Sequence, residues 1–73
     1  MKYYLIKSNN KYFVHFANIK NETVFSDVHG AHWFEDYMYN TKEGEKLEEA
    51  RFKLQEKGFS TTIEVLEINN YPL

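Results

Sequence analysis

The chain of 73 residues has room for one domain, which we expect to span residues 1–73, and none for a second. It contains no cysteine, so neither a disulfide nor a thiolate metal site can stabilise it, and thirteen aromatic residues (six Tyr, six Phe and one Trp) are available to fill a small core. The net charge of −2 and the single arginine argue against direct binding of nucleic acid, because nucleic-acid binders are normally basic.

Charge is unevenly distributed along the chain. Residues 1–21 contain four lysines and no acid, residues 22–49 contain eight acids and two lysines, and residues 50–73 contain three of each sign, giving +4, −6 and 0. No apolar run is long enough to span a membrane, and the four apolar residues before Lys7 are too few for a signal peptide. We therefore expect a cytoplasmic protein without membrane contact that carries a binding surface rather than a reaction centre.

The N-terminal third predicts a three-stranded antiparallel meander over residues 3–7, 11–19 and 22–26, which are rich in aromatic and β-branched residues. Asn9-Asn10 tolerate the positive φ of a tight hairpin turn, and Lys20-Asn21 provide a second two-residue turn. Strict alternation along the second strand would place Tyr12, Val14 and Phe16 on one face and Phe13, His15 and Ala17 on the other.

Residues 40–57 predict the helix. Asn40 and Glu43 have the spacing of a capping box, and Gly58 is well suited to the position that follows a helix. The buried side of this helix is a narrow apolar stripe formed by Leu47, Ala50 and Leu54.

Residues 59–68 predict the last strand, in which the apolar positions change phase between Val65 and Leu66. That change indicates either a bulge or a strand covered on both faces. We expect residues 69–73 to be a loose tail, and the aromatic cluster within residues 27–39 suggests a short helical turn. The predicted fold is therefore α+β with the order β-β-β-α-β, a single sheet with one helix packed on one face.

A metal site is the first chemistry to consider. His29, His32 and Glu35 are spaced by three residues and would share one face of a helix, where imidazole and carboxylate could bind zinc. Gly30 weakens such a helix, so we expect no metal and no cofactor, with the two histidines on the surface.

Catalysis has little support in the sequence. The chain contains no nucleophile elbow, no phosphate-binding glycine loop and no zinc-protease motif. The carboxylate pairs Glu35-Asp36 and Glu48-Glu49 are adjacent in sequence, which is more typical of a solvated face than of an acid/base dyad. We expect no catalytic residue.

Residues 33–39 contain four aromatics and a methionine, more than a small core easily buries. Exposed aromatic and methionine side chains ringed by charge are typical of interaction surfaces. The simpler alternative is that Trp33 and Phe34 close one end of the sheet and only the tyrosines are exposed. We predict that a partner contacts residues of this cluster, namely Trp33, Tyr37, Met38 and Tyr39.

Acidic residues connect this cluster to the helix and complete the predicted partner-binding set: Glu35, Asp36, Glu45, Glu48 and Glu49. Their negative field could be attracted to a basic groove, and a groove that normally holds DNA or RNA would make the domain a competitor for nucleic acid. The alternative is an ordinary soluble helix face, since acids also favour a helix N-terminus.

Two other functions are compatible with the sequence. Tyr3, Tyr12, Phe13 and Phe16 lie on the lysine-bearing hairpins and could stack the bases of a single-stranded nucleic acid. The exposed edges of a small sheet, or its surplus aromatics, would also favour a structural homodimer.

Several segments together resemble a group of small, early phage-encoded proteins: residues 2–6, 11–14 and 31–34, the helix around Glu49-Ala50, and the closing residues 63–65. Such proteins often bind and disable a host enzyme, and their targets include the sliding clamp, transcription factors and defence nucleases. The resemblance shares no site motif, so it assigns no functional residue. It implies a non-catalytic inhibitor that binds a bacterial nucleic-acid-handling protein, either replication machinery or a CRISPR-type defence nuclease, in the cytoplasm of a bacterial host.

Overall fold

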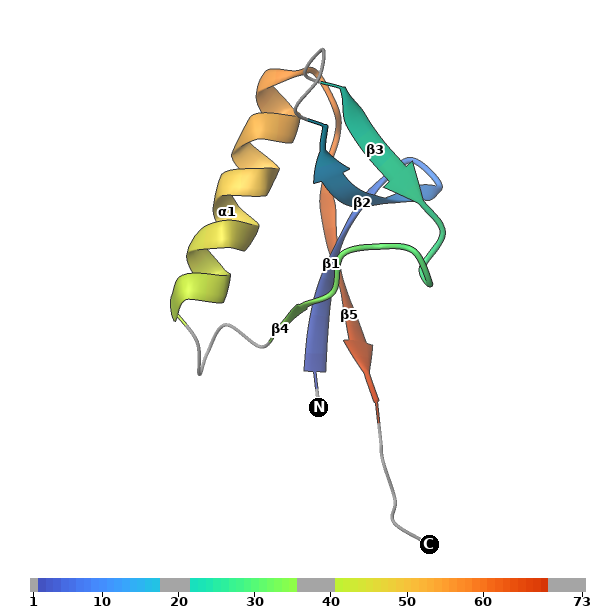
Figure 1. Ribbon diagram of the computed structural model, residues 1–73, viewed down its shortest axis with the longest axis vertical. Helices are drawn as coiled ribbons and strands as arrows, with labels where there is room; N and C mark the ends of the chain where they lie inside the picture. The colour runs from blue at the N-terminus through green and yellow to red at the C-terminus, as the bar shows by residue number, and fades with distance from the viewer. Residues whose placement is uncertain (1, 18–21, 36–40, 69–73) are drawn as a thin grey trace, which may run out of the picture.

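The computed structural model describes residues 2–17, 22–35 and 41–68 (Figure 1). Several sequence predictions lie outside these residues: the turn at Lys20-Asn21, the helix cap Asn40 and the tail 69–73. The same is true of four predicted partner-binding residues, Asp36, Tyr37, Met38 and Tyr39.

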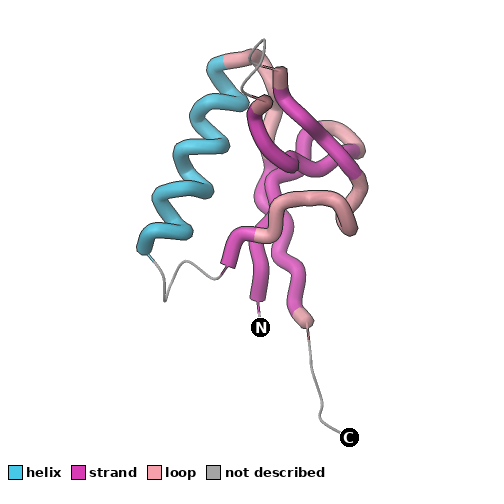
Figure 2. The backbone as a smooth tube through the Cα atoms, in the orientation of Figure 1, coloured by secondary structure: helices cyan, strands magenta, loops and turns pink. Residues whose placement is uncertain are grey.

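Five strands and one helix make up the described fold. Their order is β1 (Lys2–Ser8), β2 (Lys11–Phe16), β3 (Thr23–Ser26), β4 (Phe34–Glu35), α1 (Thr41–Glu56) and β5 (Thr62–Glu67) (Figure 1). The predicted α+β class, with three strands, a helix and a final strand, is confirmed, and the helix lies on one side of the strands (Figure 2). In the described part of the aromatic cluster the expected helical turn is wrong, because Phe34 and Glu35 are extended and form β4, while residues 36–39 lie outside the described residues.

The central strand β1 has a different arrangement on each edge. Along one edge β5 pairs with it continuously and antiparallel, from Lys2↔Glu67 to Lys7↔Thr62. The other edge is shared, since β2 pairs only at Lys7↔Tyr12 and Ser8↔Lys11, while β4 pairs near the opposite end at Tyr4↔Phe34 and Tyr3↔Glu35. Strand β2 therefore leaves β1 after two residue pairs and continues the sheet through β3.

The register of β2 against β3 shifts between Phe13 and His15, which leaves Val14 as an extra residue. The shift brings Phe13 and Phe16 to the same side, with ring centroids 4.8 Å apart, so the strict alternation expected from the sequence is wrong. Burial of both rings against the core stabilises the fold more than one regular backbone pair between the strands would, since a buried Phe contributes about 1.5–3 kcal/mol.

The bulge expected in the last strand is also wrong. The pairing of β5 with β1 is unbroken from Thr62 to Glu67, so no extra residue explains the change of phase. The strand is not covered on both faces either, because 54% of Val65 is exposed.

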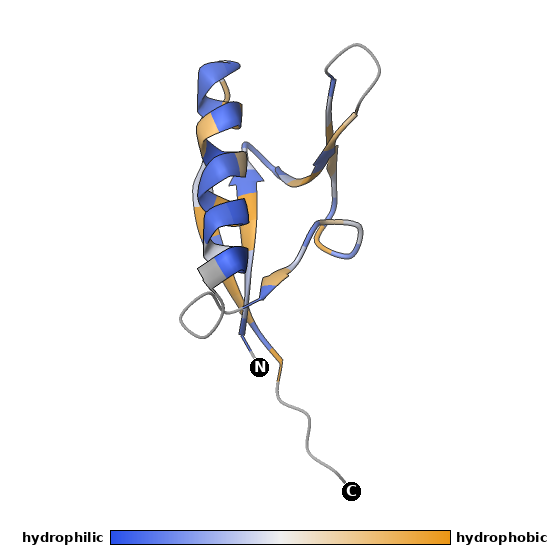
Figure 3. Cartoon of the chain, turned by 60° about the vertical axis from the view of Figure 1, so that its left-hand side comes forward, coloured by the Kyte–Doolittle hydropathy of each residue, from blue (hydrophilic) through white to orange (hydrophobic). Residues whose placement is uncertain are grey.

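The core lies between α1 and the sheet. The predicted stripe of Leu47, Ala50 and Leu54 is buried against the strands, with Leu54 completely inaccessible. The sheet contributes Ile6, Phe13 and Phe34. Figure 3 shows the corresponding division, with hydrophobic residues concentrated in the strands and α1 mostly hydrophilic.

Two local predictions about chain reversals are confirmed. Gly58 has φ +92°, and the backbone N–H groups of Phe59 and Gly58 donate to the carbonyls of Leu54 and Gln55, both at 3.0 Å, which is the Schellman arrangement of a helix end. Asn9 has φ +56° in the two-residue turn between β1 and β2. A search of the described residues finds no helix with the length and apolar character of a membrane span.

Candidate functional site

Trp33 is held by the segment that precedes it. The Asp27 carboxylate accepts hydrogen bonds from the backbone N–H groups of His29 and Gly30, at 3.1 and 3.0 Å, and so fixes a turn. The Trp33 indole N–H donates to the Val28 carbonyl at 2.8 Å, and the Trp33 ring lies 5.5 Å from that of Tyr3. Trp33 is only partly exposed, and it makes both of these contacts within the chain. Contact with a partner through Trp33 stays a prediction.

The three residues considered for zinc do not form a helical face. His32 packs against Phe34, with ring centroids 4.1 Å apart, and Glu35 lies in the extended strand β4. No three His, Asp or Glu side chains within residues 2–17, 22–35 and 41–68 come together as a metal ion would require.

The four aromatics considered for base stacking are divided between the two faces of the sheet. Phe13 is 4% exposed within the core, and the ring of Phe16 packs beside it. Tyr3 and Tyr12 lie opposite, since they pair with Leu66 and Lys7 on the face of β1 turned away from Ile6. The four rings therefore do not lie together on one face, and binding of a single-stranded nucleic acid stays a prediction.

Tyr12 takes part in a polar cluster on that opposite face. Its hydroxyl donates to the Glu64 carboxylate at 2.8 Å, and the Lys7 ammonium lies 3.9 Å from the same carboxylate and 5.7 Å from the centre of the Tyr12 ring. The hydrogen bond to Glu64, together with desolvation and the Glu64 charge, raises the pKa of Tyr12 above its ordinary value of 10.0.

The outer face of α1 is the strongest candidate for a binding surface. Among the described residues two large hydrophobic side chains are well exposed, Phe52 at 62% and Val65 at 54%. Phe52 lies among helix positions three or four residues apart that hold Gln55 and four glutamates. We call the glutamates and Phe52 the outer stripe: Glu45, Glu48, Glu49, Phe52 and Glu56. The stripe contains the three predicted helix acids and one aromatic residue that the sequence reasoning missed.

Cations form a second line on one flank of the outer stripe. Lys42, Lys46 and Lys53 lie on the side toward β2, while Arg51 lies on the other side of the helix. Helix α1 contains five glutamates, three lysines and one arginine, a net charge of −1 from five negative and four positive groups.

One ion pair connects the two lines of charge, because Glu49 pairs with Lys53 at 3.3 Å with the i,i+4 spacing of a helix. Glu48 pairs instead with Arg51 on the other side, also at 3.3 Å, and Lys46 pairs with Glu43 at 3.4 Å. Within the described part of the chain Glu45 and Glu56 form no ion pair. The glutamates of the outer stripe without an ion pair to a described residue are therefore those at its two ends, and Phe52 lies between them.

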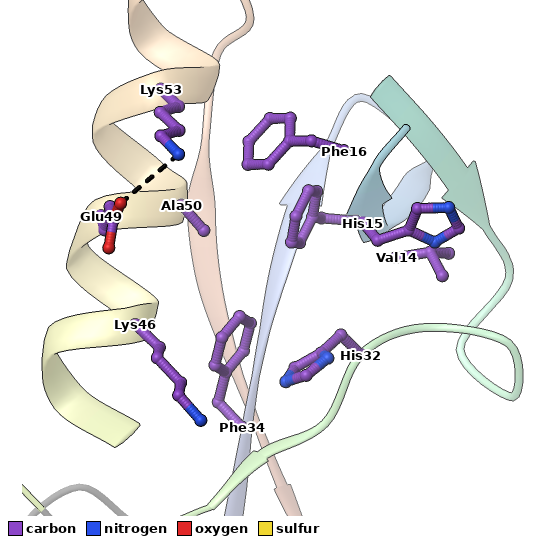
Figure 4. A pocket seen from close by; sticks show the side chains of 10 residues that line it. Val14, His15, Phe16, His32, Phe34, Lys46, Glu49, Ala50 and Lys53 are labelled. Atoms are coloured by element: carbon purple, nitrogen blue, oxygen red, sulfur yellow. Dashed lines mark ion pairs between the residues drawn. The ribbon is translucent and has the colours of Figure 1, made fainter. Parts of the chain in front are cut away.

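An open groove lies on the basic flank of α1, where β2 has separated from β1. Its volume is about 280 Å³, and the rings of Phe13, Phe16 and Phe34 form its floor. Figure 4 shows Lys46 and Lys53 extending from α1 beside this groove, with Phe16, Phe34 and His32 across from them.

The sequence reasoning favoured the dense aromatic cluster and overlooked both the groove and Phe52. The separation of β2 from β1 depends on contacts between residues far apart in the sequence, so no local sequence pattern predicts it. Phe52, in contrast, could have been found, because its position in the helix falls outside the apolar stripe of Leu47, Ala50 and Leu54.

Comparison of the chain with protein-family models, with curated proteins and with solved structures gave no match.

Proposed function

We propose that this protein is a non-catalytic inhibitor that docks the outer stripe of α1 on a basic surface of a bacterial nucleic-acid-handling protein. The observation that carries the proposal is the exposure of Phe52, 62% of which is accessible among the four glutamates of the outer stripe. A phenyl ring that is 62% exposed contributes little burial to the fold, whereas a partner would gain the burial of a large apolar group.

The arrangement around Phe52 is that of a binding hot spot. A central aromatic ring surrounded by polar side chains that exclude water is the usual anatomy of the residues that dominate interface energetics. Here the surrounding residues are Glu48, Glu49 and Glu56. We therefore assign to Phe52 the role of affinity anchor that the sequence suggested for Trp33.

The acidic residues of the outer stripe indicate the charge of the partner's surface. A negative face accelerates association with a positive one and disfavours other surfaces, and basic grooves are typical of proteins that hold DNA or RNA. Occupation of such a groove would exclude nucleic acid, which is the inhibition we propose. The resemblance to early phage proteins supports a bacterial target and a cytoplasmic location.

The test compares three forms of the chain as baits in a bacterial lysate: wild type, Phe52→Ala, and the matched control Val65→Ala, which removes the other exposed apolar side chain. We expect wild type and Val65→Ala to capture the same protein and Phe52→Ala to lose it. The purified target should then bind nucleic acid less well in the presence of the wild-type chain. Equal capture by all three forms, or a target whose nucleic-acid binding is unaffected, would contradict the proposal.

A further inference from the structure

The groove on the basic flank of α1 has a chemistry opposite to that of the outer stripe. Its floor is aromatic, while the side chains of Lys46 and Lys53 at its rim are 65% and 51% exposed. His15 and His32 also line it and are exposed. The groove can therefore bury an apolar group, and its lysines can attract negatively charged side chains next to that group.

Both lysines at the rim already form ion pairs within the helix. Lys53 lies 3.3 Å from Glu49, the one carboxylate among the residues that line the groove, and Lys46 lies 3.4 Å from Glu43. Because the side chains of Lys46 and Lys53 remain 65% and 51% exposed, a second carboxylate can still reach their ammonium groups. The Lys53 ammonium also lies 5.6 Å from the centre of the Phe16 ring, close enough for a cation–π contact. An incoming carboxylate would find Lys46 and Lys53 at the opening.

We propose that this groove receives the outer stripe of a second copy of the chain. Phe52 of the second copy would enter above Phe16 and Phe34, while its Glu48 and Glu56 would meet Lys46 and Lys53 of the first. The occupant is chosen by complementarity, because the same molecule presents an exposed ring between acids and an aromatic groove between cations.

The dimensions fit one side chain of a docking helix. Pockets for whole small-molecule ligands are commonly about 300–1,000 Å³, and this groove, at about 280 Å³, falls just below that range. A helix that lies in a groove and inserts one apolar anchor, with charged neighbours three or four residues away, is a recurring recognition mode.

Such a contact is heterologous, since the inserting surface is centred on Phe52 and the receiving surface is the neighbouring groove, with Glu49 at the boundary between them. Each added copy would leave one outer stripe and one groove unused, so association would continue head to tail unless the geometry closes a ring. The inference goes beyond the proposed function, and it implies that self-association and target binding compete for Phe52.

The test uses two complementary defective variants. The first, Phe52→Ala with Glu56→Lys, removes the inserting surface and keeps the groove. The second, Lys46→Glu with Lys53→Glu, reverses the charge of the groove and keeps Phe52, Glu48 and Glu56 of the inserting surface, although Glu49 loses its ion pair with Lys53. A matched control, Lys2→Glu with Lys11→Glu, reverses two exposed lysines elsewhere. Circular dichroism verifies that each variant is folded, and sedimentation velocity measures its size over a range of concentrations.

We expect wild type and the control to form species larger than a dimer as concentration rises. Each defective variant alone should associate about tenfold or more weakly, while their equimolar mixture should form a heterodimer and nothing larger. Three outcomes would overturn the inference: monomeric wild type at every concentration, a mixture no larger than its components, or dimers that persist in both variants, as pairing through the edge of β5 would give.

Target capture separates this inference from the proposed function. The Lys46→Glu/Lys53→Glu variant keeps Phe52 and should still capture the target, so either idea can fail without the other. Loss of target capture in that variant would show that the groove receives the target rather than a second copy.

Discussion

Trp33 and Phe52 are both large aromatic residues outside the central core, and the fold treats them differently. Trp33 is held in place within the chain, since its indole N–H donates to the Val28 carbonyl at 2.8 Å and its ring packs on Tyr3. The outer stripe of α1 leaves Phe52 with 62% of its surface exposed. Trp33 lies in the densest aromatic segment of the chain, and Phe52 lies among charged residues.

The difference shows what distinguishes a binding aromatic from a structural one. Local density of rings is a poor guide, because neighbouring rings can pack on one another and on the sheet, as Trp33 does. An isolated ring on the polar side of an amphipathic helix has no such neighbours, so its exposure needs another explanation. Substitutions of buried and of exposed apolar residues should therefore have different effects on stability and on binding.

The largest effect should come from removing the apolar residue on the inner side of α1. Leu54→Ala leaves a cavity where the side chain is completely inaccessible, and we expect the free energy of unfolding to fall by about 2–5 kcal/mol. Phe52→Ala, on the opposite side of the same helix, should change it by no more than about 0.5 kcal/mol. Urea denaturation of both variants measures the difference, and comparable losses would show that Phe52 is part of the folded core after all.

The end of α1 provides the second test. Gly58→Ala places a Cβ on a backbone with φ +92°, and the left-handed conformation should cost about 1–2 kcal/mol of stability. Gly44→Ala is the matched control. Gly44 lies inside α1, where alanine in place of glycine should raise the stability of the protein by about 1 kcal/mol. Thermal unfolding monitored by circular dichroism compares the two. Equal shifts of Tm would mean that the Schellman end contributes nothing.

Trp33 itself gives the third test. Trp33→Phe keeps a ring beside Tyr3 but removes the N–H that donates to the Val28 carbonyl, and we expect a loss of about 0.5–1.5 kcal/mol. The same variant should capture the target as well as wild type does. A stable Trp33→Phe protein with weakened capture would reverse the assignment of roles and return the anchor to the aromatic cluster.

Features governed by neighbouring residues were predictable from the sequence. The stripe of Leu47, Ala50 and Leu54, the helix end at Gly58 and the hairpin turn at Asn9 all follow from spacing or from backbone preferences that act over a few residues. The α+β class followed from these elements, because one amphipathic helix must cover one face of a sheet.

Features governed by distant contacts were not predictable in the same way. The register shift at Val14 serves the packing of Phe13 and Phe16 against the helix, and strand β4 exists because β2 leaves part of the β1 edge unpaired. The acids Glu45, Glu48 and Glu49 were identified from composition alone. Phe52, which lies among them, was also predictable from its helix position outside the stripe of Leu47, Ala50 and Leu54, and the structure adds that 62% of it is exposed.

The smallest effect concerns Tyr12, an aromatic on the face of the sheet opposite α1. Because the hydrogen bond to Glu64 raises its pKa above 10.0, the folded protein holds the phenolic proton more tightly than the unfolded chain does. That stabilisation is fully present below pH 10 and is lost as the pH rises through the higher pKa of the folded state. We expect stability between about pH 9 and about pH 11 to fall more steeply in wild type than in Tyr12→Phe, which has no proton to lose. Urea denaturation at several pH values measures both slopes, with Tyr3→Phe as the control that leaves the Glu64 hydrogen bond intact. Parallel slopes for wild type and Tyr12→Phe would mean that the Glu64 contact does not persist in solution, and the ring of Tyr12 would then join Phe52 among the aromatics that the fold leaves available to a partner.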